Sequence, residues 1–292
     1  MGGLPVGEAM SATAARSDTP TETGVDDRHL TRPGTPMIGP YSTNQMDDFY
    51  AALSRGEAKP SGLMNLLQHL LVAEQCAPGS RVLDVCCGRG LALPLLYRYA
   101  PQIAGYVGLD ISTDNLTEAR DRIDALRTAY GDLFPVNLLE CDVAEPWPAL
   151  PSFTVALYTS ALEHLPFELG AQSLRNTAAA LAPGGVLYLS TPAAVGPPPR
   201  PLQYRVHVYE WSRDEVEQVV SDAGLIVEDV IGLLPPERDV VEGALAGRYG
   251  DAAADWYRDL ADRVPAALLD AVSAVAVPDV ATELLFVCRR PA

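Results

Sequence analysis

Residues 81–90, Arg-Val-Leu-Asp-Val-Cys-Cys-Gly-Arg-Gly, are the stretch that most restricts how this chain can fold. An apolar run is followed by small residues, an order typical of a buried strand, a tight loop and the start of a helix. Gly88 and Gly90 give the loop backbone freedom, so its N–H groups can approach a ligand closely, with the N-terminus of the next helix pointing at any negative group. Asp84 adds a carboxylate near the end of the strand. The stretch predicts a ligand-binding strand–loop–helix unit.

A second acidic strand end follows this unit. Residues 105–110 read as a strand that ends in Asp110, twenty positions after Gly90. An acid at this place is suited to bind the two hydroxyls of a ribose, which predicts a nucleoside cofactor. A purely structural role for Asp110, capping the next helix, is less favoured because Ser112 or Thr113 can cap it.

A nicotinamide dinucleotide is the competing cofactor. Its loop would read GxGxxG, and the third glycine allows close packing of helix on strand. Residues 86–91 read Cys-Cys-Gly-Arg-Gly-Leu and lack that glycine. The loop therefore favours a different nucleoside cofactor.

Strand and helix patterns alternate along the chain, which predicts an α/β fold with a mostly parallel sheet covered on both faces. Ligands in such sheets bind at the carboxyl ends of the strands. The turn 182–185, Ala-Pro-Gly-Gly, is expected to precede the fifth strand. The expected strands are 82–85, 105–110, 135–141, 153–158, 186–190, 225–231 and 282–288, and the expected helices between them are 91–99, 113–130, 167–181 and 211–223.

Residues 81–234 are expected to form the core of the α/β unit described above. The two ends of the chain and one long connection fall outside this range. Residues 1–36 contain scarcely any large apolar side chain and are expected to form a disordered tail. Residues 37–80 carry two helical patterns. Residues 235–280 are long for a connection in such a sheet and predict a helical cap, which completes a substrate pocket or forms a homodimer interface. Residues 281–292 supply the final strand.

Composition excludes several functions. The net charge of −17, without a cluster of Lys or Arg, disfavours nucleic acid as a partner, although acidity that serves solubility alone remains an alternative. The five cysteines are odd in number, and the adjacent Cys86 and Cys87 cannot form a CxxC pair, so we expect reduced thiols in a cytoplasm and no metal site. No apolar run reaches membrane-spanning length, so no membrane partner is expected.

Five motifs in order resemble those of class I S-adenosylmethionine-dependent methyltransferases. The first is Val82 to Gly90, and the second, Gly108 to Ser112, looks like the ribose-binding acidic motif of that family. They continue with Cys141-Asp142-Val143, Ala161-Leu162-Glu163-His164-Leu165 and Leu181-Ala182-Pro183-Gly184-Gly185. The last two are similar to the small-molecule branch that includes ubiquinone- and menaquinone-biosynthesis methyltransferases. The resemblance implies a Rossmann-like, doubly wound sheet of seven strands whose last strand is antiparallel, with residues 37–80 as a lid over the cofactor.

The resemblance also implies which residues bind S-adenosylmethionine. Asp110 would bind the ribose, Asp142 the adenine amino group, and Asp84 would orient the loop or meet the ammonium through water. The remaining expected contacts are Tyr41, Cys86, Cys87, Gly88, Gly90, Ile111, Val143, Tyr158 and Ser160. Cys86 departs from the family, which usually has glycine there, and we expect it to need φ < 0. Arg89 stands where a small hydroxyl residue is common.

Two histidines are candidates for the proton acceptor that methylation of a hydroxyl or ammonium needs. His164 follows the fourth strand, where a structural or cofactor-shaping role is an equal alternative. His207 lies in a loop rich in Pro and Tyr that follows the fifth strand. Such loops often carry function, although a rigid surface connector is the alternative. Of the other two histidines, His69 lies in a leucine-rich pattern and is interpreted as structural.

The sequence thus predicts an enzyme that transfers a methyl group from S-adenosylmethionine to a small molecule, in specialised metabolism. Oxygen is the first candidate for the methylated atom, then nitrogen, then carbon. The alternatives are a protein or tRNA methyltransferase and a noncatalytic protein that binds S-adenosylmethionine.

Overall fold

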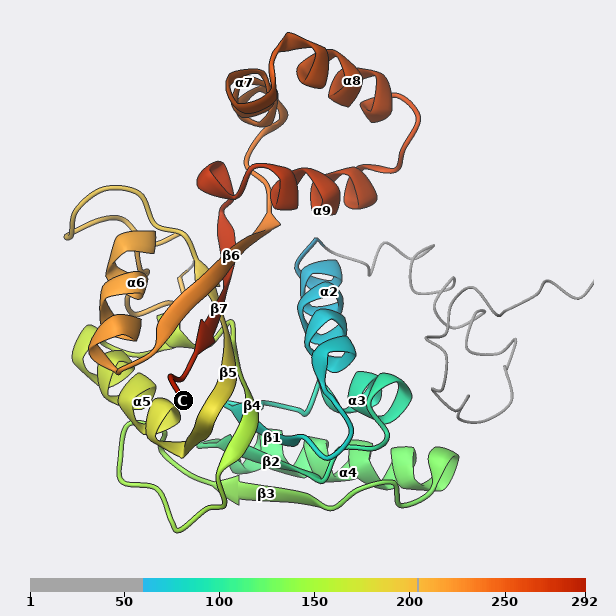
Figure 1. Ribbon diagram of the computed structural model, residues 1–292, viewed down its shortest axis with the longest axis vertical. Helices are drawn as coiled ribbons and strands as arrows, with labels where there is room; N and C mark the ends of the chain where they lie inside the picture. The colour runs from blue at the N-terminus through green and yellow to red at the C-terminus, as the bar shows by residue number, and fades with distance from the viewer. Residues whose placement is uncertain (1–59, 204) are drawn as a thin grey trace, which may run out of the picture. The chain divides into compact units, whose positions relative to one another are not determined.

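The computed structural model describes residues 60–203 and 205–292, and the strands within them form one sheet in the order β3-β2-β1-β4-β5-β7-β6 (Figure 1). Paired strands from β3 to β5 are parallel, and β7 runs antiparallel to both β5 and β6. The predicted sheet, with its antiparallel last strand, is confirmed. The strands are β1 (Arg81–Val85), β2 (Gly105–Asp110), β3 (Val136–Glu140), β4 (Phe153–Thr159), β5 (Leu181–Pro192), β6 (Ile226–Leu234) and β7 (Glu283–Arg289).

Helices cover both faces of the sheet (Figure 1). The core on one face includes Val72 of α2, Leu96 of α3 and Ile123 of α4. The core on the other face includes Leu174 of α5 and Val216 of α6. The helices are α2 (Pro60–Gln75), α3 (Leu93–Tyr99), α4 (Thr113–Tyr130), α5 (Phe167–Ala180) and α6 (Arg213–Asp222).

The ends of α4 agree with the sequence. The side chain of Ser112 accepts a hydrogen bond from the Asn115 N–H at 3.2 Å, which satisfies a donor of the first turn. Gly131, at φ +82°, ends the helix and donates its N–H to the Arg127 carbonyl at 2.8 Å. This helix directly follows Asp110, so its N-terminus faces the carboxyl edge of the sheet, where the motifs gather.

β5 begins earlier than the sequence indicated. We expected residues 182–185 to form a turn, but the strand starts at Leu181 and its pairing jumps from Phe153↔Leu181 to Val155↔Val186. The extra residues make a bulge in which Gly184 has φ +77°. The prediction of a turn was wrong because a bulge uses the same left-handed freedom of glycine that a turn uses.

α2 is one of the helices that cover the sheet. The Ser190 hydroxyl at the end of β5 donates a hydrogen bond to Oε1 of Gln68 on α2 at 2.7 Å. The interpretation of residues 37–80 as a lid over the cofactor stays a prediction. The earlier part of that segment, with Tyr41, and the tail 1–36 lie outside the described residues.

Three helices fill the connection between β6 and β7, as the sequence predicted: α7 (Arg238–Tyr249), α8 (Asp251–Ala261) and α9 (Ala266–Ala276), followed by the short turn η3 (Pro278–Val280). They share a small apolar core that includes Val241 and Tyr257. The two ends of the insertion meet at the sheet, where the Thr282 N–H donates to the Leu234 carbonyl at 2.8 Å. Among the described residues, none of the helices is both long and apolar enough to cross a bilayer.

Candidate functional site

The loop after β1 is fastened to the neighbouring strand. The Cys87 N–H donates to the Leu109 carbonyl of β2 at 2.9 Å, and the Gly90 N–H donates back to the Cys87 carbonyl at 3.0 Å. Gly108 permits this approach, because a Cβ atom at that position would lie 2.8 Å from Cys87 Sγ. A Cβ atom on Gly88, by contrast, would have no neighbour within 4 Å. The loop therefore has open space beside Gly88.

Cys86 adopts a left-handed backbone conformation with φ +57°, so the expectation of φ < 0 was wrong. The chain must turn sharply between the end of β1 and the anchored Cys87, and the turn imposes this conformation. Among the described non-glycine residues, the other positive φ is that of Ser160, at +48°, directly after β4. Such strain costs on the order of 1 kcal/mol or more and is concentrated at functional sites. Here both cases lie at the carboxyl ends of two adjacent strands.

The Asp110 carboxylate holds the loop in place and can still accept a further hydrogen bond. Its carboxylate accepts hydrogen bonds from the Gly88 N–H at 2.8 Å, the Ser112 N–H at 2.9 Å and Nδ2 of Asn115 at 3.3 Å. An ionised carboxylate can accept about four hydrogen bonds. One acceptor position therefore remains for a hydroxyl of a ribose, beside the open space at Gly88.

Asp84 is buried beneath the loop. Its Oδ2 accepts a hydrogen bond from the Tyr106 hydroxyl at 2.6 Å. Burial raises the pKa of Asp84 to about 7, the hydrogen bond from Tyr106 lowers it, and the charge of Asp110 raises it further. A carboxyl group with this pKa can ionise when a cationic group comes near, which suits the place of a cofactor ammonium.

The buried carboxyl of Asp84 leads to a prediction for stability. Its native pKa of about 7 lies above the ordinary 3.8, so the folded state holds a proton that the unfolded state loses, and stability falls as pH rises from about 4 to about 7. The full effect is on the order of 4 kcal/mol. Asp84→Asn removes this titration, so its unfolding free energy should fall less than that of the wild type between pH 5 and pH 8 in urea titrations. Identical slopes would contradict the assignment, and the exposed Asp114→Asn is the control.

Two features at the ends of β2 and β3 suit an adenine ring. Ile111, directly after Asp110, is 66% exposed despite its apolar side chain. Asp142 is exposed after β3, and its Oδ1 accepts the Ala144 N–H at 3.0 Å. Val143 is buried, and its carbonyl accepts hydrogen bonds from the side chains of Trp147 and Asn176. An apolar surface and a carboxylate are what the face and the amino edge of a purine require.

Tyr158 stays a predicted cofactor contact. Its side chain is buried, and its hydroxyl lies 2.8 Å from the Ser173 hydroxyl of α5 and beside Cys86 of the loop after β1. Residues alternate between the two faces of a strand, and this register turns Tyr158 into the core. Ser160, two residues on, does lie at the strand end, and its N–H donates to the Ser190 hydroxyl at 3.0 Å.

The two candidate histidines lie together, although they are far apart in sequence. Their ring centroids are 5.3 Å apart in an edge-to-face arrangement. His164 belongs to the short helix η2 (Leu162–His164) after β4. The loop that carries His207 is fixed to η2 because the Val208 and Tyr209 N–H groups donate to the Glu163 carbonyl at 2.8 and 3.1 Å. The structure thus joins two residues that the sequence could only propose separately.

Three acidic residues near the histidines were missed or left without a role by the sequence. Nδ1 of His207 lies 2.6 Å from Oε1 of Glu210, and Oε2 of Glu163 accepts the Thr191 hydroxyl at 3.0 Å. Glu283, the first residue of β7, lies with its Oε1 3.4 Å from the Ser160 hydroxyl. The three-residue spacing of His207 and Glu210 was a usable signal. No such signal existed in the sequence for Glu283, because only the antiparallel direction of β7 places this residue at the carboxyl edge of the parallel strands.

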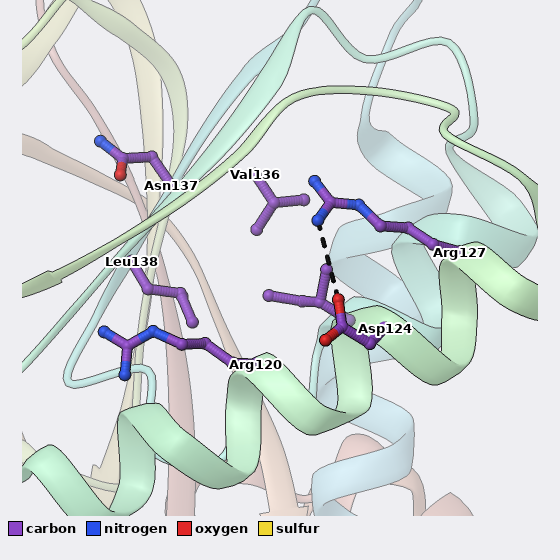
Figure 2. A pocket seen from close by; sticks show the side chains of 7 residues that line it. Arg120, Asp124, Arg127, Val136, Asn137 and Leu138 are labelled. Carbon is purple, nitrogen blue, oxygen red and sulfur yellow. Dashed lines mark ion pairs between the residues drawn. The ribbon is translucent and has the colours of Figure 1, made fainter.

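A separate pocket lies elsewhere on the sheet (Figure 2). It is lined by side chains of α4 and of the first half of β3, with Arg127 and Asp124 paired at 3.9 Å. The residues at the carboxyl ends of the strands are not part of its lining. We therefore assign the candidate site to the carboxyl edge and not to this pocket.

Comparison with known families agrees with this geometry. A family model described as a methyltransferase domain matches residues 57–230, more than half of the chain. The chain belongs to this methyltransferase family. The cofactor expected from the sequence, S-adenosylmethionine, is confirmed, and the residues present fit it, since Asp110 keeps an acceptor position and the loop is open at Gly88.

Individual relatives of this methyltransferase share about a third of its residues over the matched regions. A ubiquinone biosynthesis O-methyltransferase from Xanthomonas campestris pv. campestris is 32% identical over 157 residues, covering 52% of this chain and 62% of that protein. A protein of the same name from Xanthomonas axonopodis pv. citri is 30% identical over 213 residues, covering 66% of this chain and 85% of that protein. The chain thus spans less than two thirds of the first relative. The solved structure of the 4+2 cyclase SpnF, at 19% identity and a TM-score of 0.52, covers 78% of this chain and 81% of its own and shows the fold alone.

Proposed function

We propose that this protein transfers a methyl group from S-adenosylmethionine to an oxygen atom of a small molecule in specialised metabolism. The observation that carries the proposal is the pair of His164 and His207, whose rings lie 5.3 Å apart at the carboxyl edge where the cofactor loop also ends. Nitrogen and then carbon are the next candidate acceptors. The relatives named ubiquinone biosynthesis O-methyltransferase support oxygen first.

The division of labour within the site follows from the contacts. When bound, S-adenosylmethionine supplies a methyl group activated on a sulfonium. We assign Asp110 to its ribose, Asp84 to its ammonium, Ile111 and Asp142 to its adenine. The loop backbone of Cys86, Cys87, Gly88 and Gly90, together with Val143 and Ser160, completes the cofactor contacts in this proposal.

The acceptor side needs a group that takes up a proton. As the S–CH₃ bond breaks and the O–CH₃ bond forms, the sulfonium becomes a thioether and the acceptor hydroxyl loses its proton. An ionised Glu210 carboxylate can only accept hydrogen bonds, so Nδ1 of His207 must donate to its Oε1. A neutral His207 therefore carries its proton on Nδ1. Nε2 of His207, or that of His164, is then the atom we propose as proton acceptor.

The net charge of −17 supports a small molecule over nucleic acid as the acceptor. The five cysteines are unpaired in the structure, which supports the cytoplasm as the compartment. A protein acceptor and binding without transfer remain the alternative functions, and both can be separated by experiment.

Calorimetry and a transfer assay test the proposal in sequence. S-adenosylhomocysteine should bind the full chain with one site, and labelled methyl groups should pass from S-adenosylmethionine to small phenols or alcohols. Absence of binding at millimolar S-adenosylhomocysteine would overturn the assignment. Binding without transfer to any fraction of a cell extract would favour the noncatalytic alternative, and label that enters only macromolecules would favour a protein or tRNA acceptor.

A further inference from the structure

Arg200 lies in the long connection between β5 and α6, the same segment that carries His207, and the proposed function gives it no task. Of this connection the structure describes residues 193–203 and 205–212, which contain no helix and no strand. Connections of this length without secondary structure are uncommon, and they are usually functional. Side-chain contacts must hold such a segment in one conformation, and Arg200 makes several of them.

The Arg200 side chain is only 7% exposed and contacts three separate parts of the chain. Its Nη1 donates a hydrogen bond to the Gly196 carbonyl, near the start of the connection. Its Nε donates to the Glu210 carbonyl at 3.0 Å, near the end of the connection. Its Nη2 forms an ion pair with Oε2 of Glu215 in the first turn of α6. The planar guanidinium thus joins both ends of the connection to a helix.

Glu215 is a well-fixed partner for this guanidinium. Its Oε2 accepts the Ser212 N–H at 2.8 Å as part of the capping box of α6, and its Oε1 accepts the Tyr209 hydroxyl at 2.7 Å. Burial raises the pKa of Glu215, but hydrogen bonds from Ser212, Tyr209 and Arg200 outweigh it, so the pKa lies below its usual value. The carboxylate is therefore ionised at neutral pH and keeps its ion pair with Arg200.

Glu210 connects Arg200 to the ring of His207. Arg200 binds the backbone carbonyl of Glu210, and Oε1 of the same residue lies 2.6 Å from Nδ1 of His207. This Oε1 also accepts the Gln203 N–H at 2.8 Å, from the part of the connection that follows Arg200. The position of the Glu210 carboxylate, and with it that of the His207 ring, therefore depends on the contacts of Arg200.

We propose that Arg200 is a positioning residue for methyl transfer, which holds this connection so that His207 lies beside His164. The proposal rests on the proposed function, in which Nε2 of one of these rings takes up the acceptor proton. A proton acceptor works only within hydrogen-bond reach of the hydroxyl, so a small displacement of the ring lowers the rate. Arg200 fixes the position of the ring before the acceptor binds. A lysine cannot do the same, because one ammonium does not reach two carbonyls and a carboxylate at once.

Kinetics of single and double variants of the full chain test how Arg200 acts. Arg200→Gln should lower kcat of methyl transfer about 10- to 100-fold, and Arg200→Lys should recover only part of this loss. The affinity for S-adenosylhomocysteine should stay within about 2-fold of the wild type, because the cofactor loop follows β1 and is distant from this connection in sequence. In a His207→Ala background, Arg200→Gln should change kcat by less than about 3-fold, since the ring that it positions is absent. Arg213→Gln is the matched control, because Arg213 begins α6 and pairs with Glu217 and Asp279.

Hydrogen exchange measures the position of the connection without any acceptor. The Val208 and Tyr209 N–H groups donate to the Glu163 carbonyl, so they are protected while the connection stays docked on η2. Arg200→Gln should speed their exchange at least about 10-fold, and the control Arg213→Gln should leave it unchanged. If circular dichroism shows that Arg200→Gln does not fold, Arg200→Lys serves for both measurements.

Three results would overturn the role of Arg200. They are unchanged exchange at Val208 and Tyr209, a kcat equal to that of the Arg213→Gln control, and a loss of kcat as large without His207 as with it. Failure of the proposed function is a different result, in which methyl transfer is absent from the wild type or His207→Ala keeps its full rate. The exchange measurement still decides in that case whether Arg200 holds the connection.

Discussion

Replacing Asp110 with asparagine is expected to weaken the binding of S-adenosylhomocysteine about 100-fold. The carboxylate accepts hydrogen bonds from two backbone N–H groups, those of Gly88 and Ser112. An asparagine side chain offers one oxygen and one NH₂ group, so its NH₂ must face one of these donors. It would also lose the charge-assisted hydrogen bond that we assign to the ribose, worth about 1.5–3 kcal/mol. Calorimetry at pH 7.5 measures the effect directly.

Asp114→Asn is the control for this experiment, since Asp114 lies exposed in the first turn of α4. It removes the same charge from the same helix start without touching the loop. An Asp110→Asn protein that folds normally and binds S-adenosylhomocysteine within 3-fold of the wild type would show that Asp110 only supports the loop.

The second large effect is expected at the histidines. His207→Ala and His164→Ala should each lower kcat of methyl transfer about 100-fold, within the range that loss of a positioned proton acceptor produces. Their affinity for S-adenosylhomocysteine should stay within about 2-fold of the wild type, because our assignments place both rings on the acceptor side. The double variant should lose little more than either single one, since residues that act as one unit are not additive. Single-turnover rates across pH give the comparison.

His69→Gln is the control that shows whether the loss of kcat is specific to His164 and His207. Burial lowers the pKa of His69 to about 4, and its Nε2 lies 3.2 Å from the Thr159 hydroxyl. His69 is therefore a neutral structural group, and its variant should lose stability without a comparable loss of kcat. If His164→Ala and His207→Ala both kept near-normal kcat at every pH, the role of the pair would be refuted.

The sequence predicted the parts of the site that local patterns encode. The strand–loop–helix at Asp84 to Gly90 and the acid at Asp110 lie within one motif each, and their spacing is set by the lengths of one helix and two strands. The direction of a parallel sheet then brings both to the same edge. Local capping residues such as Ser112 were predictable for the same reason, because a cap depends on its own first turn.

The rest depends on contacts between distant segments. Tyr158 points inward because of the register of β4, and Cys86 takes a positive φ because its neighbour is tied to β2. Glu283 reaches the site only because β7 runs against its neighbours. Glu163, His164 and His207 come together only because the loop that carries His207 docks on η2. None of these follows from periodicity, which describes one segment at a time.

The insertion of α7, α8 and α9 has a consequence for how this enzyme can diversify. A hydrogen bond from the Thr282 N–H to the Leu234 carbonyl joins the two ends of the insertion, so the segment forms a closed loop on the sheet. The entropy of closing a loop changes only slowly with its length. α7 and α8 can therefore be shortened, lengthened or exchanged while β6 and β7 keep their pairing, whereas α9 packs directly on β6, where a Cβ atom on Gly232 would lie 2.1 Å from the Ala274 carbonyl oxygen. The insertion attaches at the edge of the sheet to which we assign the acceptor. A lineage with this architecture can change what it methylates without rebuilding what it binds as methyl donor.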